Sequence, residues 1–266
     1  MRWLHIKEVQ KLINSEKSKN KLPEFQIKLK NQTNIKMCEP FRIECLRLAK
    51  LAEKYKEKIS ELYNTIAKCV IREECSVDGE SLFRGFYHPS PIFDIVVGNC
   101  NRGRLLKRIT KKSRVTFKYG FDKSNRLVIV ESMFNLSNKI REFIIYNENT
   151  ALGIGFDSEN SICYLCEEVF ENNKIMHLIR ASYCAHENRI STLHKEDYIY
   201  DKYGLKIADI YMYYPDLPLV DHLHFDFQHD EEGYLSKYTS ISFEGSVFQR
   251  SAWTGHEFEV KVKRKI

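Results

Sequence analysis

Apolar residues in the second half of the chain alternate with polar ones in the manner of β-strands. From about residue 115 onward, short runs place apolar side chains at every second position and are rich in aromatic and β-branched residues. The predicted strands are 115–121, 127–133, 141–146, 151–156, 162–170, 174–183, 198–200, 205–214, 223–228, 235–243, 248–253 and 258–262.

Four of the turns between these runs have nearly the same sequence. In each, an Asp is followed three residues later by Asn or Gly: Asp122 to Asn125, Asp157 to Asn160, Asp201 to Gly204, and Asp230 to Gly233. An Asp side chain can accept a hydrogen bond from the backbone two residues on, and Asn or Gly tolerates a positive φ. Two further tight turns are expected at residues 147–150 and 171–174. Strands joined by short turns are antiparallel neighbours, so the pattern predicts a long meander of repeated hairpins.

The first part of the chain follows a helical pattern instead. From Pro40 onward, apolar residues recur at alternating spacings of four and three, which predicts one packing helix from about 40 to 74. A short amphipathic helix is expected at 3–14. Residues 15–37 are expected to form a loop around a short extended run, 25–29.

These elements define the fold class as α+β, with N-terminal helices packed on a C-terminal antiparallel β-meander. Charge follows the same division. Residues 1–120 hold 26 Lys and Arg against 13 Asp and Glu, and the remainder holds 16 against 23, so the net charge of +6 combines +13 with −7. We expect a helical, basic region at 1–114 and an acidic meander at 115–266, as two units or as one continuous domain.

Composition narrows the class of protein. The charged start of the chain lacks the apolar core of a signal peptide, and no run is long enough to span a membrane. Eight cysteines without a regular framework suggest reduced thiols. We therefore expect a cytoplasmic protein that makes no membrane contact.

Two cysteine-containing motifs have the residue types of a zinc site. Cys163 and Cys166 form one pair, and Cys184 with His186 forms another that a hairpin would bring closer. However, strand geometry places Cys163 and Cys166 on opposite faces, which is typical of cysteines that fill a core. We therefore expect no metal and no cofactor, with this cluster as the alternative.

A second candidate is the run His222-Leu-His224-Phe-Asp226, which places three polar groups on one strand face. It resembles part of the metallo-β-lactamase-type hydrolase signature, but Phe227 stands where that family has a further His. A surface or partner-binding role is the favoured interpretation. The chain also lacks a Gly-rich phosphate loop or a nucleophile elbow, so we expect no enzyme.

One segment is strongly basic and has no acid. Its cations are Arg102, Arg104, Lys107, Arg108, Lys111, Lys112 and Arg114. Such a segment can neutralise phosphates, which makes nucleic-acid binding through residues 102–118 a possible function. Alternatively, it forms an amphipathic helical turn with a solvated face, or it contacts the acidic half of the chain.

The acidic hairpins offer the opposite surface. Their candidate partner-binding residues are Glu167, Glu168, Glu171, Asp230, Glu231 and Glu232, with Tyr211, Tyr213 and Tyr214 as aromatic anchors. Carboxylates of this kind attract a basic protein partner, and aromatic anchors with charged rims are typical of binding hot spots.

The repeated turn resembles the hairpin unit of RHS/YD-repeat proteins, an aromatic residue followed by Asp-x-x-Gly-x-Leu. The best match is Tyr200-Asp201-Lys-Tyr-Gly204. The whole chain resembles the meander-rich immunity proteins of bacterial polymorphic toxin systems. The resemblance implies a non-enzymatic cytoplasmic protein that binds and neutralises a cognate toxin domain, and nucleic-acid binding is the alternative.

Overall fold

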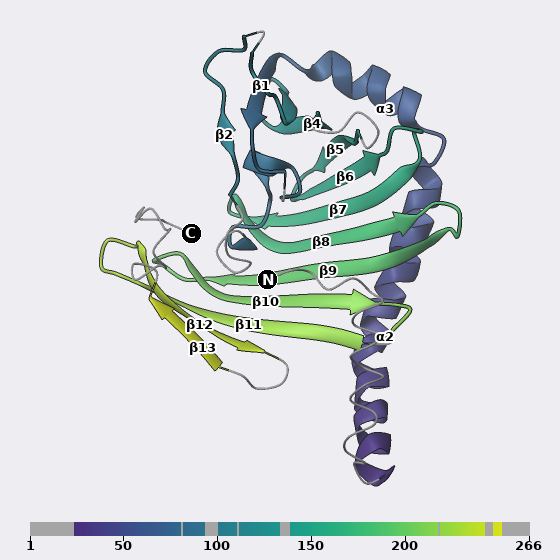
Figure 1. Cartoon of the computed structure of the whole chain (residues 1–266), viewed down its shortest axis with the longest axis vertical. Helices are drawn as coiled ribbons and strands as arrows, with labels where there is room; N and C mark the ends of the chain where they lie inside the picture. The colour runs from purple at the N-terminus through teal and green to yellow at the C-terminus, as the bar shows by residue number, and fades with distance from the viewer. Residues whose placement is uncertain are drawn as a thin grey trace.

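A computed structural model describes residues 24–80, 82–93, 101–110, 112–133, 139–217, 219–242 and 247–251, with side chains between residues 37 and 241 of these ranges. It consists of one antiparallel sheet with helices on one face (Figure 1). The strands are β1 (Arg72–Val77), β2 (Arg104–Leu105), β3 (Phe117–Phe121), β4 (Leu127–Ser132), β5 (Arg141–Asn147), β6 (Thr150–Phe156), β7 (Ile162–Glu171), β8 (Lys174–Cys184), β9 (Arg189–Tyr200), β10 (Leu205–Tyr214), β11 (Leu219–His229), β12 (Leu235–Ser242) and β13 (Val247–Ser251).

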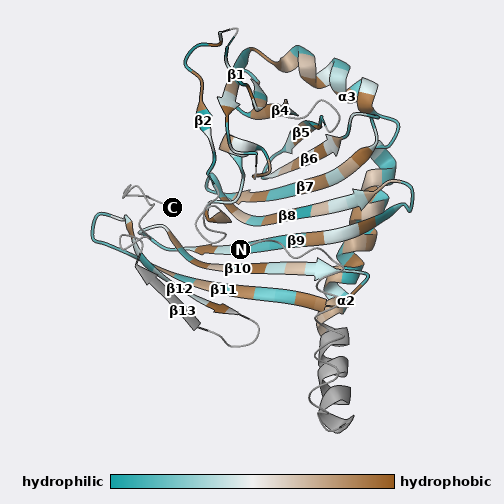
Figure 2. Ribbon diagram, in the orientation of Figure 1, coloured by the Kyte–Doolittle hydropathy of each residue, from teal (hydrophilic) through white to brown (hydrophobic). Residues whose placement is uncertain are grey.

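The meander predicted from the alternation is confirmed. The sheet has 13 described strands, and from β3 to β13 their order in the sheet is their order in the chain. Hydrophobic and hydrophilic bands alternate along strands β7 to β11 in Figure 2. The expected elements at 3–14 and 258–262 lie outside the described residues.

The repeated turns form as predicted. Asp122, Asp157, Asp201 and Asp230 each accept a hydrogen bond from the backbone N–H two residues on. The third residue after each Asp has a positive φ, 60° at Asn125 and 80° at Gly233. These turns hold successive strands in antiparallel register.

Strand β9 is much longer than the predicted 198–200. Its first part carries polar residues on both faces, which conceals the alternation that identifies a half-buried strand. Glu196 is almost fully buried on one face, whereas Lys195 and Asp197 lie on the other. The strand was predicted too short because contacts distant in the sequence accommodate its polar residues. The Ser90 hydroxyl donates to Glu196, and His177 contacts Asp197.

The first helix, α2, spans Glu24–Tyr55 and has Pro40 in its interior. The predicted extended run 25–29 and the helix start at Pro40 are therefore both wrong. Residues 24–39 contain no Gly or Pro that would interrupt the helix, and Pro40 itself lies at an exposed position.

The predicted helix 40–74 also ends too late. α2 stops at Tyr55, a second helix, α3, spans Ile59–Ile66, and residues 72–77 form β1, which pairs with β3. The predicted apolar face of α2 nevertheless packs on the sheet. Leu48 and Ala52 are fully buried in the core that the helix shares with β5 to β11, so this face covers the sheet rather than a second helix.

The other face of the sheet is crossed by residues 78–80 and 82–93, which we call the crossing segment. It contains a short 3-10 helix, η2 (Gly85–Tyr87), and its Ile92 packs among sheet residues that include Leu178 and Tyr198. The face under α2 is called the α2 face below, and the opposite one the inner face.

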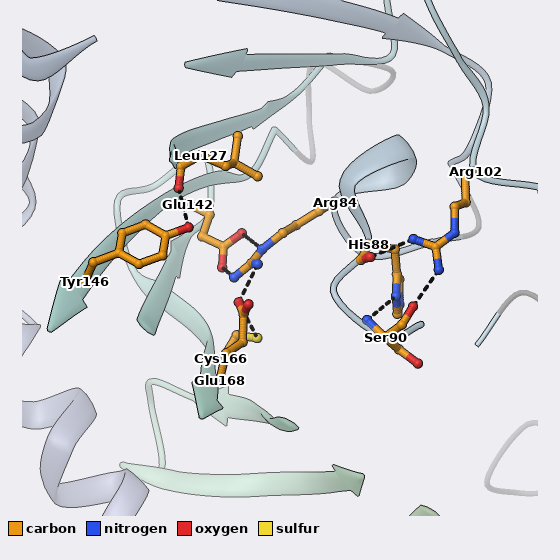
Figure 3. A network of polar contacts seen from close by, with 9 residues as sticks. All are labelled: Arg84, His88, Ser90, Arg102, Leu127, Glu142, Tyr146, Cys166 and Glu168. Carbon is orange, nitrogen blue, oxygen red and sulfur yellow. Dashed lines mark hydrogen bonds and ion pairs between the residues drawn. The ribbon is translucent and has the colours of Figure 1, made fainter. Parts of the chain in front are cut away.

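Arg84 of the crossing segment makes a buried ion pair with the sheet (Figure 3). Its guanidinium donates two hydrogen bonds to Glu142, at 2.8 and 2.7 Å, and one to Glu168 at 2.6 Å. The Arg84 side chain is only 3% exposed. Gly153 provides the space, because a Cβ there would lie 1.9 Å from the Glu142 carboxylate. The ion pair thus joins the crossing segment to β5 and β7.

We predict that Arg84→Met destabilises the protein by about 3–5 kcal/mol at neutral pH, because it leaves two carboxylates buried without their cation. Chemical denaturation at neutral pH measures the loss as a change in the free energy of unfolding.

The matched control is Arg47→Met. Arg47 pairs with Glu44 and Glu167 at the surface, where such pairs contribute about 1 kcal/mol or less. Equal losses for the two variants would contradict the importance assigned to Arg84.

Candidate functional site

Two of the predicted partner-binding carboxylates are engaged inside the molecule. Glu168 is buried on the inner face against Arg84, and Glu167, on the α2 face, pairs with Arg47 of the helix. Successive strand residues point to opposite faces, so this acidic pair does not form one surface. Glu168 is therefore not available to a partner.

The predicted aromatic anchors lie largely beneath α2. The ring of Phe41 lies 5.5 Å from that of Tyr211 and 5.8 Å from that of Tyr213. Tyr213 is 4% exposed and belongs to the core. Tyr211 is half-buried and stacks on His222 at 4.5 Å. Tyr214, also half-buried, is the next residue and so faces the other way.

The remaining acidic candidates are at hairpin turns. Glu171, Glu231 and Glu232 are exposed, whereas the Asp230 side chain accepts backbone hydrogen bonds within its turn. Asp230 therefore has a structural role at this position.

The cysteine motifs do not assemble as a four-ligand site. Cys166 is buried on the inner face near Glu168, and Cys163 donates to the Gly155 carbonyl. Burial raises the pKa of Cys163 to about 12, so it stays a thiol, a poor metal ligand. Cys184 and His186 do lie together, with Glu187, at an exposed turn.

The His-x-His-x-Asp run lies on the α2 face of β11, and it has a partner that the sequence did not reveal. Asp209 of β10 lies 2.7 Å from Nε2 of His222 and 2.8 Å from Nδ1 of His224. Asp226 lies 3.4 Å from the other nitrogen of His224. In the sequence, Asp209 is distinguished only as the one acidic residue of the largely apolar run 205–214.

Asp209 belongs to a row of four polar residues across the α2 face, beyond the part that α2 covers. The cross-strand register places His177, Asp197, Asp209 and His224 side by side on β8, β9, β10 and β11. His177 lies 2.6 Å from Asp197, which Lys195 also contacts at 2.7 Å. We call these four residues the open-face row.

Two carboxylates are directly opposite each other at the centre of this row. The Cα atoms of such pairs are about 4.5–5.5 Å apart, and like charges at these positions are destabilising. Burial raises the pKa of Asp209, but hydrogen bonds from His224 and His222 outweigh this effect and leave it below its usual range. Asp209 is therefore ionised at neutral pH.

Apolar side chains lie beside the row. Ile199 is 53% exposed, and Val169, directly opposite His177, is 37% exposed. A surface that combines carboxylates with exposed apolar groups is suited to bind another protein.

The basic segment is organised differently from the expected helical turn. Arg104 and Leu105 form β2, which pairs with β1, and Arg102 turns inward to donate to the carbonyls of His88 and Ser90 (Figure 3). The exposed cations without an acidic partner among the described residues are Arg104, Lys107, Arg108, Lys112 and Arg114. Lys111 lies outside the described residues.

Three of these cations surround an open depression of about 390 Å³. Arg104, Lys112 and Arg114 line it together with the hydroxyl residues Thr110 and Ser113. Asp78 is the one carboxylate among the described lining residues, so the depression has a positive balance.

A second buried network connects the crossing segment to β9. The Ser90 hydroxyl donates to Glu196 at 2.7 Å, and Tyr198 donates to the same carboxylate. His88 accepts a hydrogen bond from the Ser90 backbone. Ser90 is fully buried and its hydroxyl contacts Glu196 rather than His88, so these groups form no nucleophile–base pair.

No known protein-family model matches the chain, and no curated protein matches its sequence. The resemblance to immunity proteins therefore stays a prediction. Within the described residues, neither helix combines the length and apolar character that a membrane crossing requires.

His88 provides a pH-dependent prediction. Burial lowers its pKa to about 3, against about 6.5 in an unfolded chain. Between these values only the unfolded state binds the proton, so stability falls as the pH falls. We predict that His88 accounts for about 2 kcal/mol of the stability lost between about pH 7 and pH 5.

Denaturant unfolding at both pH values measures this effect. His88→Asn should lose about 2 kcal/mol less than the wild type over the same interval. His186→Asn, at an exposed position, should behave like the wild type. An unchanged pH dependence in His88→Asn would show that His88 is not the responsible group.

Proposed function

We propose that the chain is a non-enzymatic binding protein that neutralises a cognate toxin by covering a basic surface of it. The observation that carries the proposal is the pair Asp197 and Asp209. These residues are directly opposite each other on neighbouring strands, in a part of the α2 face that no described helix covers. Such a pair weakens a sheet unless a cation compensates it. A basic side chain of the partner supplies that cation.

Neighbouring groups support the same role. Lys195 contacts Asp197, whereas the partners of Asp209 among the described residues are histidines, so the row stays attractive to Arg or Lys. Ile199 and Val169 provide apolar contact area at the side. The mechanism is stoichiometric: charge complementarity steers association, and close packing excludes water.

The test is co-expression of this chain with the genes adjacent to its own, followed by measurement of growth and of the affinity of any purified complex. We predict that Asp197→Asn with Asp209→Asn weakens the complex at least tenfold, since close interfacial charge pairs contribute about 1.5–7 kcal/mol. The double variant should lose some stability, because the hydrogen bonds that hold the pKa of Asp209 low also stabilise the folded chain. Circular dichroism therefore establishes that it is folded before its affinity is compared.

The control is the hairpin-tip variant Glu171→Gln with Glu231→Gln, which removes two exposed carboxylates away from the open-face row. It should bind as the wild type does. Toxicity that persists with the wild-type chain present would contradict neutralisation. Loss of binding in the tip variant alone would place the interface at the hairpin tips.

A second candidate function is nucleic-acid binding, favoured by the exposed cations around the depression beside β2. We predict that Arg104→Glu, Lys107→Glu, Arg108→Glu and Lys112→Glu together abolish binding to single- or double-stranded probes, whose wild-type affinity should fall steeply with salt. The control is Lys50→Glu with Lys54→Glu, on the exposed side of α2. It reverses two charges, as any two of the four substitutions do, and should leave nucleic-acid binding largely intact. No binding at low salt would eliminate this function.

A further inference from the structure

A small cavity lies on the inner face, away from the open-face row. Its volume is about 200 Å³, and it lies between the crossing segment and the sheet and is partly open to solvent. Apolar walls come from Leu82, Phe117, Val130 and Ile140. The polar groups that line it come mainly from Arg180, Tyr164 and the ion-paired Arg84.

Arg180 is the cation of the inner face that no carboxylate or carbonyl of the described residues satisfies. Its guanidinium carbon lies 4.5 Å from the centre of the Phe83 ring and 5.7 Å from that of Tyr164. Its Nε is buried and has no hydrogen-bond partner in the part of the chain that the structure describes. By contrast, Arg84 is held by two carboxylates. An unsatisfied buried donor of this kind is costly, and a ligand that accepts a hydrogen bond removes the cost.

Tyr164 supplies a second donor. Its hydroxyl makes no hydrogen bond within the described part of the chain, and burial raises its pKa well above the usual value, so it keeps its proton. The Phe83 ring packs edge-on against it at 4.9 Å, which fixes the ring in place. Arg180 and Tyr164 therefore offer N–H and O–H groups beside apolar walls.

We propose that this cavity binds a small monocarboxylate with an apolar or aromatic body, its carboxylate on Arg180 and its body against Leu82, Phe117 and Val130. A guanidinium matches a carboxylate in geometry and charge. The volume corresponds to about seven waters at ~30 Å³ each, which suits a molecule the size of benzoate.

The surrounding charges favour one carboxylate rather than several. Arg84 carries one positive charge against the two carboxylates of Glu142 and Glu168, and Glu80 is exposed at the cavity lining. A di- or tricarboxylate would place additional negative charge near these groups. Because the ligand contacts both the crossing segment and the sheet, its binding should raise the melting temperature.

The experiment is a calorimetric titration and thermal melt of the full chain with benzoate, with benzamide as the neutral isostere and inorganic phosphate as the small anion. Benzoate should bind and raise the melting temperature, whereas benzamide and phosphate should do neither at the same concentration. Arg180→Met should weaken benzoate at least tenfold, Arg180→Lys less, and Tyr164→Phe about three- to tenfold.

The control is Lys50→Met, which removes an exposed cation of α2 on the other side of the sheet and should leave benzoate affinity unchanged. Circular dichroism and the melting temperature without ligand establish that each variant is folded. If Arg180→Met does not fold, the comparison of Arg180→Lys and Tyr164→Phe with the wild type decides. Absence of benzoate binding, equal binding of benzamide, or unchanged affinity in the folded variants would overturn the proposal.

Discussion

The buried ion pair between Arg84, Glu142 and Glu168 is the interaction on which the arrangement of this protein depends. A single-layer meander buries only one face against its helices, and its other face needs a cover. The crossing segment provides that cover, and Arg84 joins it to two strands. Charges taken out of water in this way are tolerated only with close, complete pairing.

The need to pair buried charges applies to the rest of the inner face as well. Three arginines, Arg84, Arg102 and Arg180, lie with three acids, Glu142, Glu168 and Glu196. Burial raises the pKa of Glu196, but hydrogen bonds from His194, Tyr198 and Ser90 hold it below its usual value. The pairing is uneven, however, since the Arg180 guanidinium has no carboxylate partner among the described residues and lies against the Phe83 and Tyr164 rings. The uneven pairing is what distinguishes the cavity at Arg180 from the rest of this face.

The two faces therefore have different chemistry. The inner face buries Glu142, Glu168 and Glu196 with hydrogen-bond partners, and leaves the Nε of Arg180 without one among the described residues. The open-face row on the α2 face keeps carboxylates and histidines at the surface, with two acids directly opposite. On the binding proposal, these ionised groups remain at the surface to meet a basic partner.

Period-two alternation and Asp-containing turns were sufficient to predict the meander, because both signals are local. The helices were predicted less well, since Pro40 is a local stop signal that an exposed helix interior overrides. The site was the least predictable. Glu167 and Glu168 were chosen together as one acidic surface, yet only the three-dimensional structure reveals that Arg47 and Arg84 engage them from opposite faces. Asp209 was missed because its histidine partners lie on another strand.

The central claim is that partners bind the open-face row. Carboxyl-group footprinting by mass spectrometry, on the chain alone and in complex with its partner, tests it most directly. The account predicts that labelling of Asp197 and Asp209 falls on binding while labelling of Glu171 and Glu231 is unchanged. Protection of the hairpin-tip carboxylates with continued labelling of Asp197 and Asp209 would contradict it.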